Sequence, residues 1–304
     1  MAQIPSSPDP ETTILEATIG SWQHGYAQSN GIQLHYVTQG TGDLVILLHG
    51  FPEFWYSWRY QLPTLATRFR VVAPDLRGYN DSDKPDSGYD LDTLTNDIRG
   101  LLDHFGCQTA SVVAHDWGGA IAWHWAQLFP QQIRKLAVLN SPHPACFRRE
   151  FLSNWDQIRR SWYMLFFQVP YMPEWLLQRD LQDWVKRIFQ DTSVRKGAFT
   201  SQDLKIYQAA LAKPKVLTSA INYYRQLFNL PTLQSLFLEP MRQIFAPTLL
   251  IWGEEDFALS RELTEGMDSF FANSIRKEYI PECGHWAQQE APQTVNRLLL
   301  EFLS

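Results

Sequence analysis

The chain has 304 residues, of which 45% are hydrophobic and 14% aromatic, enough for a large core in one domain or in a domain with an insertion. Charged residues make up 19%, the formal net charge is −6 and no basic run occurs, which argues against nucleic acid and anionic membranes as partners. The three cysteines lack paired spacing and no stretch of about 18 apolar residues occurs, so we expect free thiols, a cytoplasmic location and no membrane span.

The first half of the chain begins with a leader and continues, from about residue 30 to 140, with alternating strands and helices. Residues 1–27 are expected to form a partly irregular leader, since they hold several prolines and lack the apolar core of a signal peptide. Short apolar runs then predict strands at 44–48, 70–73, 111–114 and 136–139, and helical patterns cover 91–105 and 119–129. This alternation is typical of a mostly parallel sheet with helices on both faces, an α/β fold.

The pattern changes between residues 144 and 231, where strand-like runs disappear. Aromatic-rich helices are predicted there at 155–167, 175–189, 203–211 and 215–228. Strand patterns return at 247–252 and 275–280, and a closing helix follows from residue 287. We therefore predict one α/β core domain, formed by residues 28–143 and 232–304, that is interrupted by a helical cap domain at 144–231.

A nucleophile is predicted at one turn from strand to helix. Residues 114–119 read Ala-His-Asp-Trp-Gly-Gly, the pattern of a nucleophile elbow with Asp116 in the place usually taken by serine. Such a turn exposes its central residue at the carboxyl edge of the sheet, beside a helix N-terminus that favours negative charge. Taken alone, Asp116 could equally be a helix N-cap. His115 is expected to be structural, because neighbouring residues on an elbow point apart.

A base and an acid are expected on the loops after the last two strands. His285 follows the final strand, and Glu254, Glu255 and Asp256 follow the preceding one. The chain order of nucleophile, acid and histidine is that of an α/β-hydrolase triad, in which the histidine is the base and the acid holds its tautomer. At this point the three acids remain alternatives.

Two backbone N–H groups are expected to form an oxyanion hole. The loop His-Gly-Phe-Pro at 49–52 follows the first long strand, and in this fold it supplies one donor, here Phe51. The residue after the nucleophile, Trp117, supplies the other. No glycine-rich nucleotide motif and no cluster with metal-ligand spacing occurs, so the prediction is a hydrolase without cofactor or metal.

An aspartate nucleophile predicts a particular class of substrate. A carboxylate suits displacement at saturated carbon, because it forms an alkyl ester that water activated by His285 can hydrolyse. Epoxides and alkyl halides both fit. An epoxide oxygen leaves as a basic alkoxide and needs an acid such as tyrosine. The predicted cap offers Tyr163, Tyr223 and Tyr224, although tyrosines in aromatic helices more often pack a core.

Several motifs match one known family. They are 49–53 (His-Gly-Phe-Pro-Glu) with 58–59 (Trp-Arg), 74–79 (Pro-Asp-Leu-Arg-Gly-Tyr) with 81–85 (Asp-Ser-Asp-Lys-Pro), 115–119, 167–170 (Phe-Gln-Val-Pro), 222–225 (Asn-Tyr-Tyr-Arg) and 284–286 (Gly-His-Trp). From about residue 28 to its end the chain resembles the soluble epoxide hydrolases, which are capped α/β-hydrolases without cofactors. The resemblance implies that Asp116 is the nucleophile, His285 the base and Asp256 the orienting acid, and that Tyr163 and Tyr224 are the ring-opening acids.

The resemblance has minor departures. Asn80 stands where a glycine is common in the family, and the segment before about residue 28 has no counterpart. The expected partners are a small apolar epoxide and water, and the chain is expected to be a monomer or a homodimer. The substrate pocket is expected to include Pro52, Phe54, Phe166 and Trp286.

Two other functions remain open. Haloalkane dehalogenases share the aspartate elbow, and Trp117 could donate to a halide. Their second donor, often an asparagine after His-Gly, is replaced here by Phe51, which has no side-chain donor. The other alternative is a binding protein that has lost catalysis, although the chain keeps a candidate for every catalytic role.

Overall fold

One sheet of eight strands carries the fold in the computed structural model, which describes residues 22–238 and 240–304. The strand order is β1-β2-β4-β3-β5-β6-β7-β8; β2 pairs antiparallel with both neighbours, and all other pairs are parallel. The strands are β1 Gln23–Ser29, β2 Ile32–Gln39, β3 Leu44–Leu48, β4 Arg70–Pro74, β5 Ala110–His115, β6 Ile133–Leu139, β7 Thr248–Gly253 and β8 Ile275–Ile280. The six strands predicted from apolar runs are confirmed, as is the fold class.

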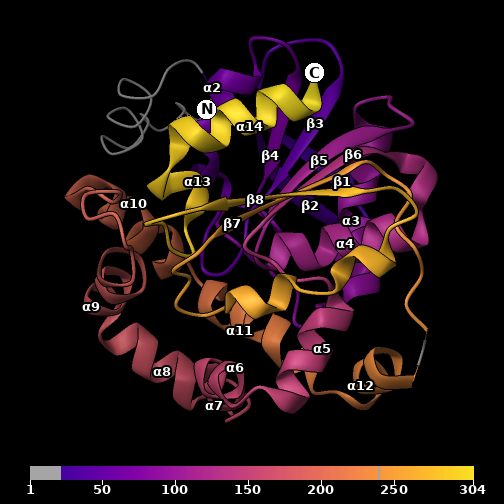
Figure 1. Cartoon of the computed structure of the whole chain (residues 1–304). Coiled ribbons are helices and arrows are strands. Elements are labelled where there is room, and N and C mark those ends of the chain that lie inside the picture. The colour runs from indigo at the N-terminus through magenta and orange to yellow at the C-terminus, as the bar shows by residue number, and fades with distance from the viewer. Residues whose placement is uncertain (1–21, 239) are drawn as a thin grey trace, which may run out of the picture.

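The burial of the central strands explains why their apolar runs could be recognised in the sequence. Every residue of β3, β5 and β7 is buried, as expected for parallel strands covered on both faces. In Figure 1, α2 and α14 lie on one side of the sheet and α3 and α4 on the other. The helices outside the segment between β6 and β7 are α2 Gln61–Leu65, α3 Leu91–His104, α4 Trp117–Leu128, α13 Ala287–Glu290 and α14 Pro292–Leu303. Short 3-10 helices lie at Trp55–Trp58, Pro130–Gln132, Arg261–Thr264 and Met267–Phe270.

A hairpin at the start of the described chain was not predicted. Strands β1 and β2 are joined by Asn30 and Gly31, whose φ angles of 48° and 79° suit a two-residue hairpin turn. Strand β1 is largely exposed and polar, so it shows no apolar run. It begins at Gln23, inside the segment 1–27 expected to be a leader, whereas residues 1–21 of that segment lie outside the described residues.

Helices follow one another between β6 and β7, where the cap was predicted. They are α5 Pro144–Ser153, α6 Trp155–Arg160, α7 Trp162–Phe166, α8 Met172–Arg179, α9 Leu181–Val185, a π-helical turn at Lys186–Asp191, α10 Ser201–Ala212, α11 Val216–Leu227 and α12 Leu230–Leu238. Figure 1 shows them in the lower and left parts of the molecule. Helix α5 was not predicted, and α12 extends past the expected boundary at residue 231.

The first two predicted cap helices are each broken. The segment 155–167 divides at Ser161 into α6 and α7, and 175–189 divides at Asp180. Asn154 begins α6, because its side chain accepts hydrogen bonds from the backbone N–H groups of Asp156 and Gln157.

Among the described residues, no helix is long and apolar enough to cross a membrane. The cysteines are free thiols, as predicted.

Candidate active site

Asp116 stands on a strained turn between β5 and α4. Its φ of 49° and ψ of −117° are outside the regions that side chains usually adopt, a strain found mainly at functional sites. The two glycines that follow permit the turn. A Cβ on Gly118 would lie 2.4 Å from the carbonyl oxygen of Leu48, and one on Gly119 would lie 2.3 Å from Cβ of Ser141. This geometry is that of a nucleophile elbow.

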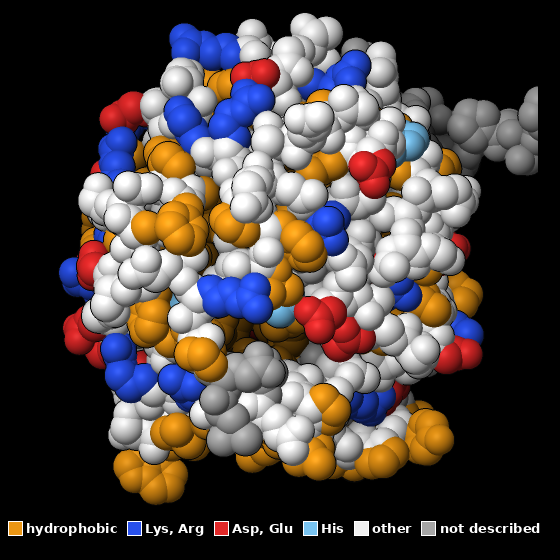
Figure 2. All heavy atoms as spheres, turned by 90° about the vertical axis from the view of Figure 1, so that its right-hand side faces the viewer, with side chains coloured by type: hydrophobic (Ala, Val, Ile, Leu, Met, Phe, Trp, Pro, Cys, Tyr) orange, Lys and Arg blue, Asp and Glu red, His pale blue; other side chains and the backbone are white. Residues whose placement is uncertain are grey.

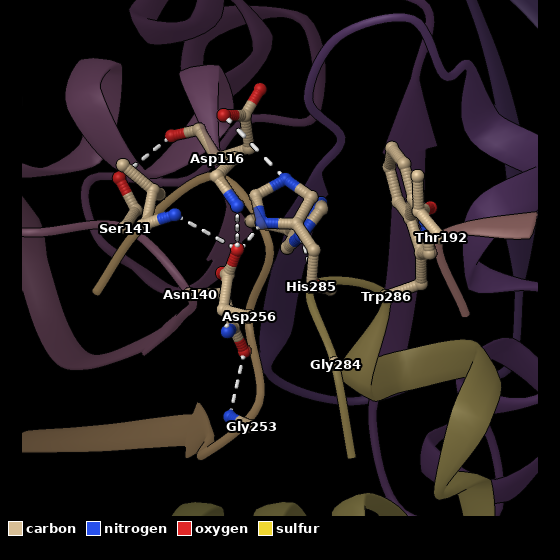
Figure 3. Close-up of polar contacts among 12 residues, drawn as sticks. Asp116, Asn140, Ser141, Thr192, Gly253, Asp256, Gly284, His285 and Trp286 are labelled. Carbon is tan, nitrogen blue, oxygen red and sulfur yellow. Dashed lines mark hydrogen bonds and ion pairs between the residues drawn. The ribbon is translucent and has the colours of Figure 1, made fainter. Parts of the chain in front are cut away.

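The structure brings the predicted base and acid to this turn. Nε2 of His285 lies 3.8 Å from Oδ2 of Asp116, and its Nδ1 lies 2.7 Å from Oδ2 of Asp256 (Figure 3). Asp256 and His285 are both 3% exposed and lie on the loops after β7 and β8. Of the rival acids, Glu254 pairs with Arg261, and Glu255 is exposed. The geometry therefore favours Asp256 as the partner of His285.

A dense set of donors fixes the carboxylate of Asp256. Its Oδ1 accepts hydrogen bonds from the backbone N–H groups of Ala258 and Leu259, at 2.8 and 2.9 Å. Its Oδ2 accepts one from Nδ2 of Asn140 at 2.8 Å. Burial alone would raise the pKa of Asp256, but His285 and these donors hold it below its ordinary value. Asp256 is therefore ionised and directed at Nδ1 of His285.

Sequence reasoning missed Asn140. This residue ends β6 with a φ of 39°, donates to Asp256 and accepts from the backbone N–H of Gly253 at 3.1 Å (Figure 3). Its position directly after a buried parallel strand, at the edge where ligand sites form, is the signal that could have identified it.

The environment of His285 favours its imidazolium form. Burial opposes the charge, but Asp256, Asp116 and Glu53 outweigh it and raise the pKa of His285 to about 9. In the free enzyme His285 is therefore a cation between two carboxylates.

The backbone N–H of Phe51 donates a hydrogen bond to the side chain of Asp116. It lies 2.8 Å from Oδ1 of Asp116. The backbone carbonyl of Asp116 accepts a hydrogen bond from Oγ of Ser141 at 2.7 Å. Trp117 is the first residue of α4, and its side chain packs against Tyr224 with ring centroids 5.2 Å apart.

The two predicted ring-opening tyrosines come together over Asp116. Tyr163 of α7 and Tyr224 of α11 meet edge to face with ring centroids 5.6 Å apart, and both line the same cavity as Asp116. Burial raises the pKa of each, and the negative charge of Asp116 raises both further, so the hydroxyls stay protonated. Tyr223, the third candidate, donates instead to the backbone carbonyl of Arg77 at 2.7 Å within the core.

The residues predicted for the substrate pocket lie elsewhere. The cavity beside Asp116 has a volume of about 550 Å³, and Pro52, Phe54, Phe166 and Trp286 are not among the described residues that line it. Phe54 packs between Trp55, Tyr56 and Tyr207, and Trp286 packs against His285 with only 1% of its surface exposed. Aromatic residues next to the motifs thus fill the core. Figure 2 shows a hollow with hydrophobic side chains and a histidine in it.

A second buried pair, formed by Glu53 and His115, contacts the backbone of His285. Glu53 accepts from Nδ1 of His115 at 2.7 Å, and Nε2 of His115 lies 2.9 Å from the backbone carbonyl of His285. Glu53 also accepts from the side-chain amides of Gln288 and Gln289. His115 is thus held in a buried hydrogen-bonded network behind His285, and Glu53, which takes part in it, was not predicted as a site residue.

Comparisons with known proteins identify the family of this chain. The sequence profile of the alpha/beta hydrolase fold family matches residues 43–292. Human Epoxide hydrolase 4 is 37% identical over 98% of this chain and 83% of its own length, and Epoxide hydrolase 1 of Caenorhabditis elegans is 38% identical over 93% and 70%. A variant of the Bacillus megaterium epoxide hydrolase, solved with its product (R)-3-[1]naphthyloxy-propane-1,2-diol, superimposes with a TM-score of 0.85 at 34% identity, over 92% of this chain and 99% of that one. The chain belongs to the α/β-hydrolase fold family and, within it, to the epoxide hydrolases.

Proposed function

We propose that this protein hydrolyses apolar epoxides to vicinal diols, with Asp116 as the nucleophile. The observation that supports this most directly is that two protonated tyrosines, Tyr163 and Tyr224, line one cavity with Asp116. His285, paired with Asp256, lies next to this carboxylate. A leaving alkoxide requires such acids, whereas a halide ion does not. The diol bound to the Bacillus megaterium relative supports the same substrate class.

The first step is displacement at an epoxide carbon. Oδ1 of Asp116 is held by the N–H of Phe51, which leaves Oδ2 to attack. The new C–O bond forms as the ring C–O bond breaks. The departing oxygen takes a proton from Tyr163 or Tyr224, which gives an alcohol and an alkyl ester on Asp116.

The second step is hydrolysis of the ester. Esterification removes the negative charge of Asp116, one of the charges that raise the pKa of His285, so this pKa falls. The imidazolium then passes its proton to the tyrosinate left by ring opening, and the neutral imidazole acts as a base. Water loses a proton to His285 and attacks the carboxyl carbon. The charge that develops on Oδ1 is stabilised by the N–H groups of Phe51 and Trp117. When the tetrahedral intermediate collapses, the bond from the carboxyl carbon to the substrate oxygen breaks, and that oxygen takes the proton of the newly added hydroxyl. The diol leaves, Asp116 is again a carboxylate and His285 is again an imidazolium.

Product analysis tests this function. Purified protein is incubated with styrene oxide and, in parallel, with 1-bromobutane; diol is measured by gas chromatography and bromide by ion chromatography. We expect diol from the epoxide and no bromide above the level of the Asp116→Asn variant. Bromide release without diol would assign the same Asp116 and His285 to haloalkane dehalogenation. Tight binding without either product would assign the fold to a binding protein.

A further inference from the structure

The cavity beside Asp116 runs in one direction, along α4. Its lining includes five residues of this helix, Trp117, Ala120, His124, Gln127 and Leu128. These positions fall on one face, a stripe about 100° wide, and span roughly 16 Å of helix axis. The nucleophile is thus at one end of a path that follows a single helix face.

The wall opposite α4 is apolar. Phe147 and Phe151, one turn apart on α5, stack with ring centroids 5.6 Å apart, and Leu233 and Phe237 of α12 also line the cavity. Such a wall suits an apolar chain rather than a polar group.

The end of the path farthest from Asp116 is polar. Nε2 of His124 lies 2.8 Å from Oδ1 of Asp92, and the Asp92 side chain is 75% exposed. Oε1 of Gln127 accepts from the backbone N–H of Arg242. An apolar chain that followed α4 would therefore reach water at these residues.

The other side of the nucleophile is filled by packed rings. Phe51 meets Phe167 and Tyr224 edge to face, with centroids 5.5 and 5.1 Å away. Farther along, Trp286 packs on Phe189 with centroids 4.9 Å apart, and both are at most 1% exposed. Phe51, Phe167, Phe189 and Trp286 are not among the described residues that line the cavity, so a second large substituent would have to displace packed rings.

We propose that the preferred substrates are terminal epoxides that carry one extended apolar chain, and that Ala120 sets the chain length the site accepts. This proposal rests on the function proposed above. An extended chain gains about 1.2 Å per bond, so a path of roughly 16 Å holds about a dozen atoms. Ala120 lies only one turn from Asp116, and its small side chain leaves the path open. Each methylene buried there strengthens binding roughly fourfold.

Two isomeric epoxides distinguish a substrate with one long substituent from a substrate with a substituent on each epoxide carbon. We would measure kcat/KM of the wild-type protein for 1,2-epoxydecane, for its isomer 5,6-epoxydecane and for 1,2-epoxybutane. We expect 1,2-epoxydecane to exceed each of the others by at least about tenfold, since only its chain is buried along α4.

Substitutions at Ala120 then test whether the apolar chain of the substrate passes this residue. Ala120→Phe should lower the ratio of kcat/KM for 1,2-epoxydecane to that for 1,2-epoxybutane at least about tenfold, because the new ring blocks the path. Ala212→Phe, at an exposed position on α10, is the matched control and should leave this ratio within about twofold. Ala120→Leu, a smaller change, should lower the ratio about threefold and serves if Ala120→Phe does not fold.

The outcomes are distinguishable. Equal use of both decane isomers, or a ratio insensitive to Ala120→Phe and to Ala120→Leu, would overturn the inference while the proposed function stands. Absence of diol from every epoxide, with the wild-type protein folded, would overturn the proposed function itself.

Discussion

Nε2 of His285 lies 3.8 Å from Oδ2 of Asp116, near enough for electrostatic attraction and too far for a hydrogen bond. The other ring nitrogen is bound at 2.7 Å to Asp256. This asymmetry leaves Oδ2 of Asp116 free to attack carbon while the imidazole stays oriented.

The pKa of His285 should depend on the charge of Asp116. We expect its NMR titration midpoint, about 9 in the free enzyme, to fall in Asp116→Asn, because that variant removes one of the charges that raise it. A midpoint unchanged in Asp116→Asn would mean that esterification does not switch His285 to a base.

The same shift affects stability. The folded-state pKa of about 9 lies above the ordinary value of 6.5, so the folded state binds this proton more tightly than the unfolded one. The stabilising contribution is therefore complete below pH 6.5 and lost as the pH rises through about 9. Urea titrations across this range should show a smaller pH-dependent loss in Asp256→Asn than in the wild type. An equal loss in both proteins would contradict this origin.

Oxygen from water should enter the enzyme before it enters the product. In a single turnover in H2-18O with protein in excess, we expect the label on the peptide that contains Asp116 and not in the diol, since water attacks the carboxyl carbon. Mass spectrometry of both species checks this. Label in the diol after one turnover would indicate direct attack of water on the epoxide.

Removal of both tyrosine hydroxyls should block ring opening and leave the fold intact. Tyr163→Phe combined with Tyr224→Phe should slow ester formation at least about 100-fold, as expected for loss of general acid catalysis. Stopped-flow fluorescence with styrene oxide measures this step, and circular dichroism checks the fold. Tyr171→Phe, whose side chain is 85% exposed, is the matched control. A wild-type rate in the double variant would remove both residues from the mechanism.

Glu53 should contribute strongly to stability. Glu53→Gln removes a buried charge that pairs with His115, and we expect the free energy of unfolding to fall by about 3 kcal/mol. Denaturant unfolding checks this. Asp86→Asn, which removes a pair with Lys215 at the surface, should leave the unfolding midpoint nearly unchanged. Equal effects in the two variants would show that burial does not matter here.

The parts of the site that depend on local sequence pattern could be predicted. Asp116 was readable because a buried strand, a small-residue turn and a helix follow one another, and the structure brings His285 and Asp256 to it. The six apolar strands were predicted for the same reason. Strands β1 and β2 were missed because β1 is polar and exposed, although Asn30 and Gly31 marked its turn.

The cavity could not be predicted because it is a product of tertiary packing. Its walls include residues of α4, α5, α7, α11 and α12, and of these helices α5 and α12 were not predicted. Phe54 and Trp286 are aromatic and close to the motifs, but their rings pack into the core, which sequence proximity does not reveal.

The central claim is that Asp116 forms a covalent ester with an epoxide, and the most direct test is mass spectrometry of the purified His285→Gln variant. The variant is incubated in parallel with styrene oxide and with 1-bromobutane. Because it should form the ester and fail to hydrolyse it, we expect an adduct with the mass of the intact epoxide on the peptide that contains Asp116. A butyl adduct alone, or an epoxide adduct on any other residue, would contradict the account.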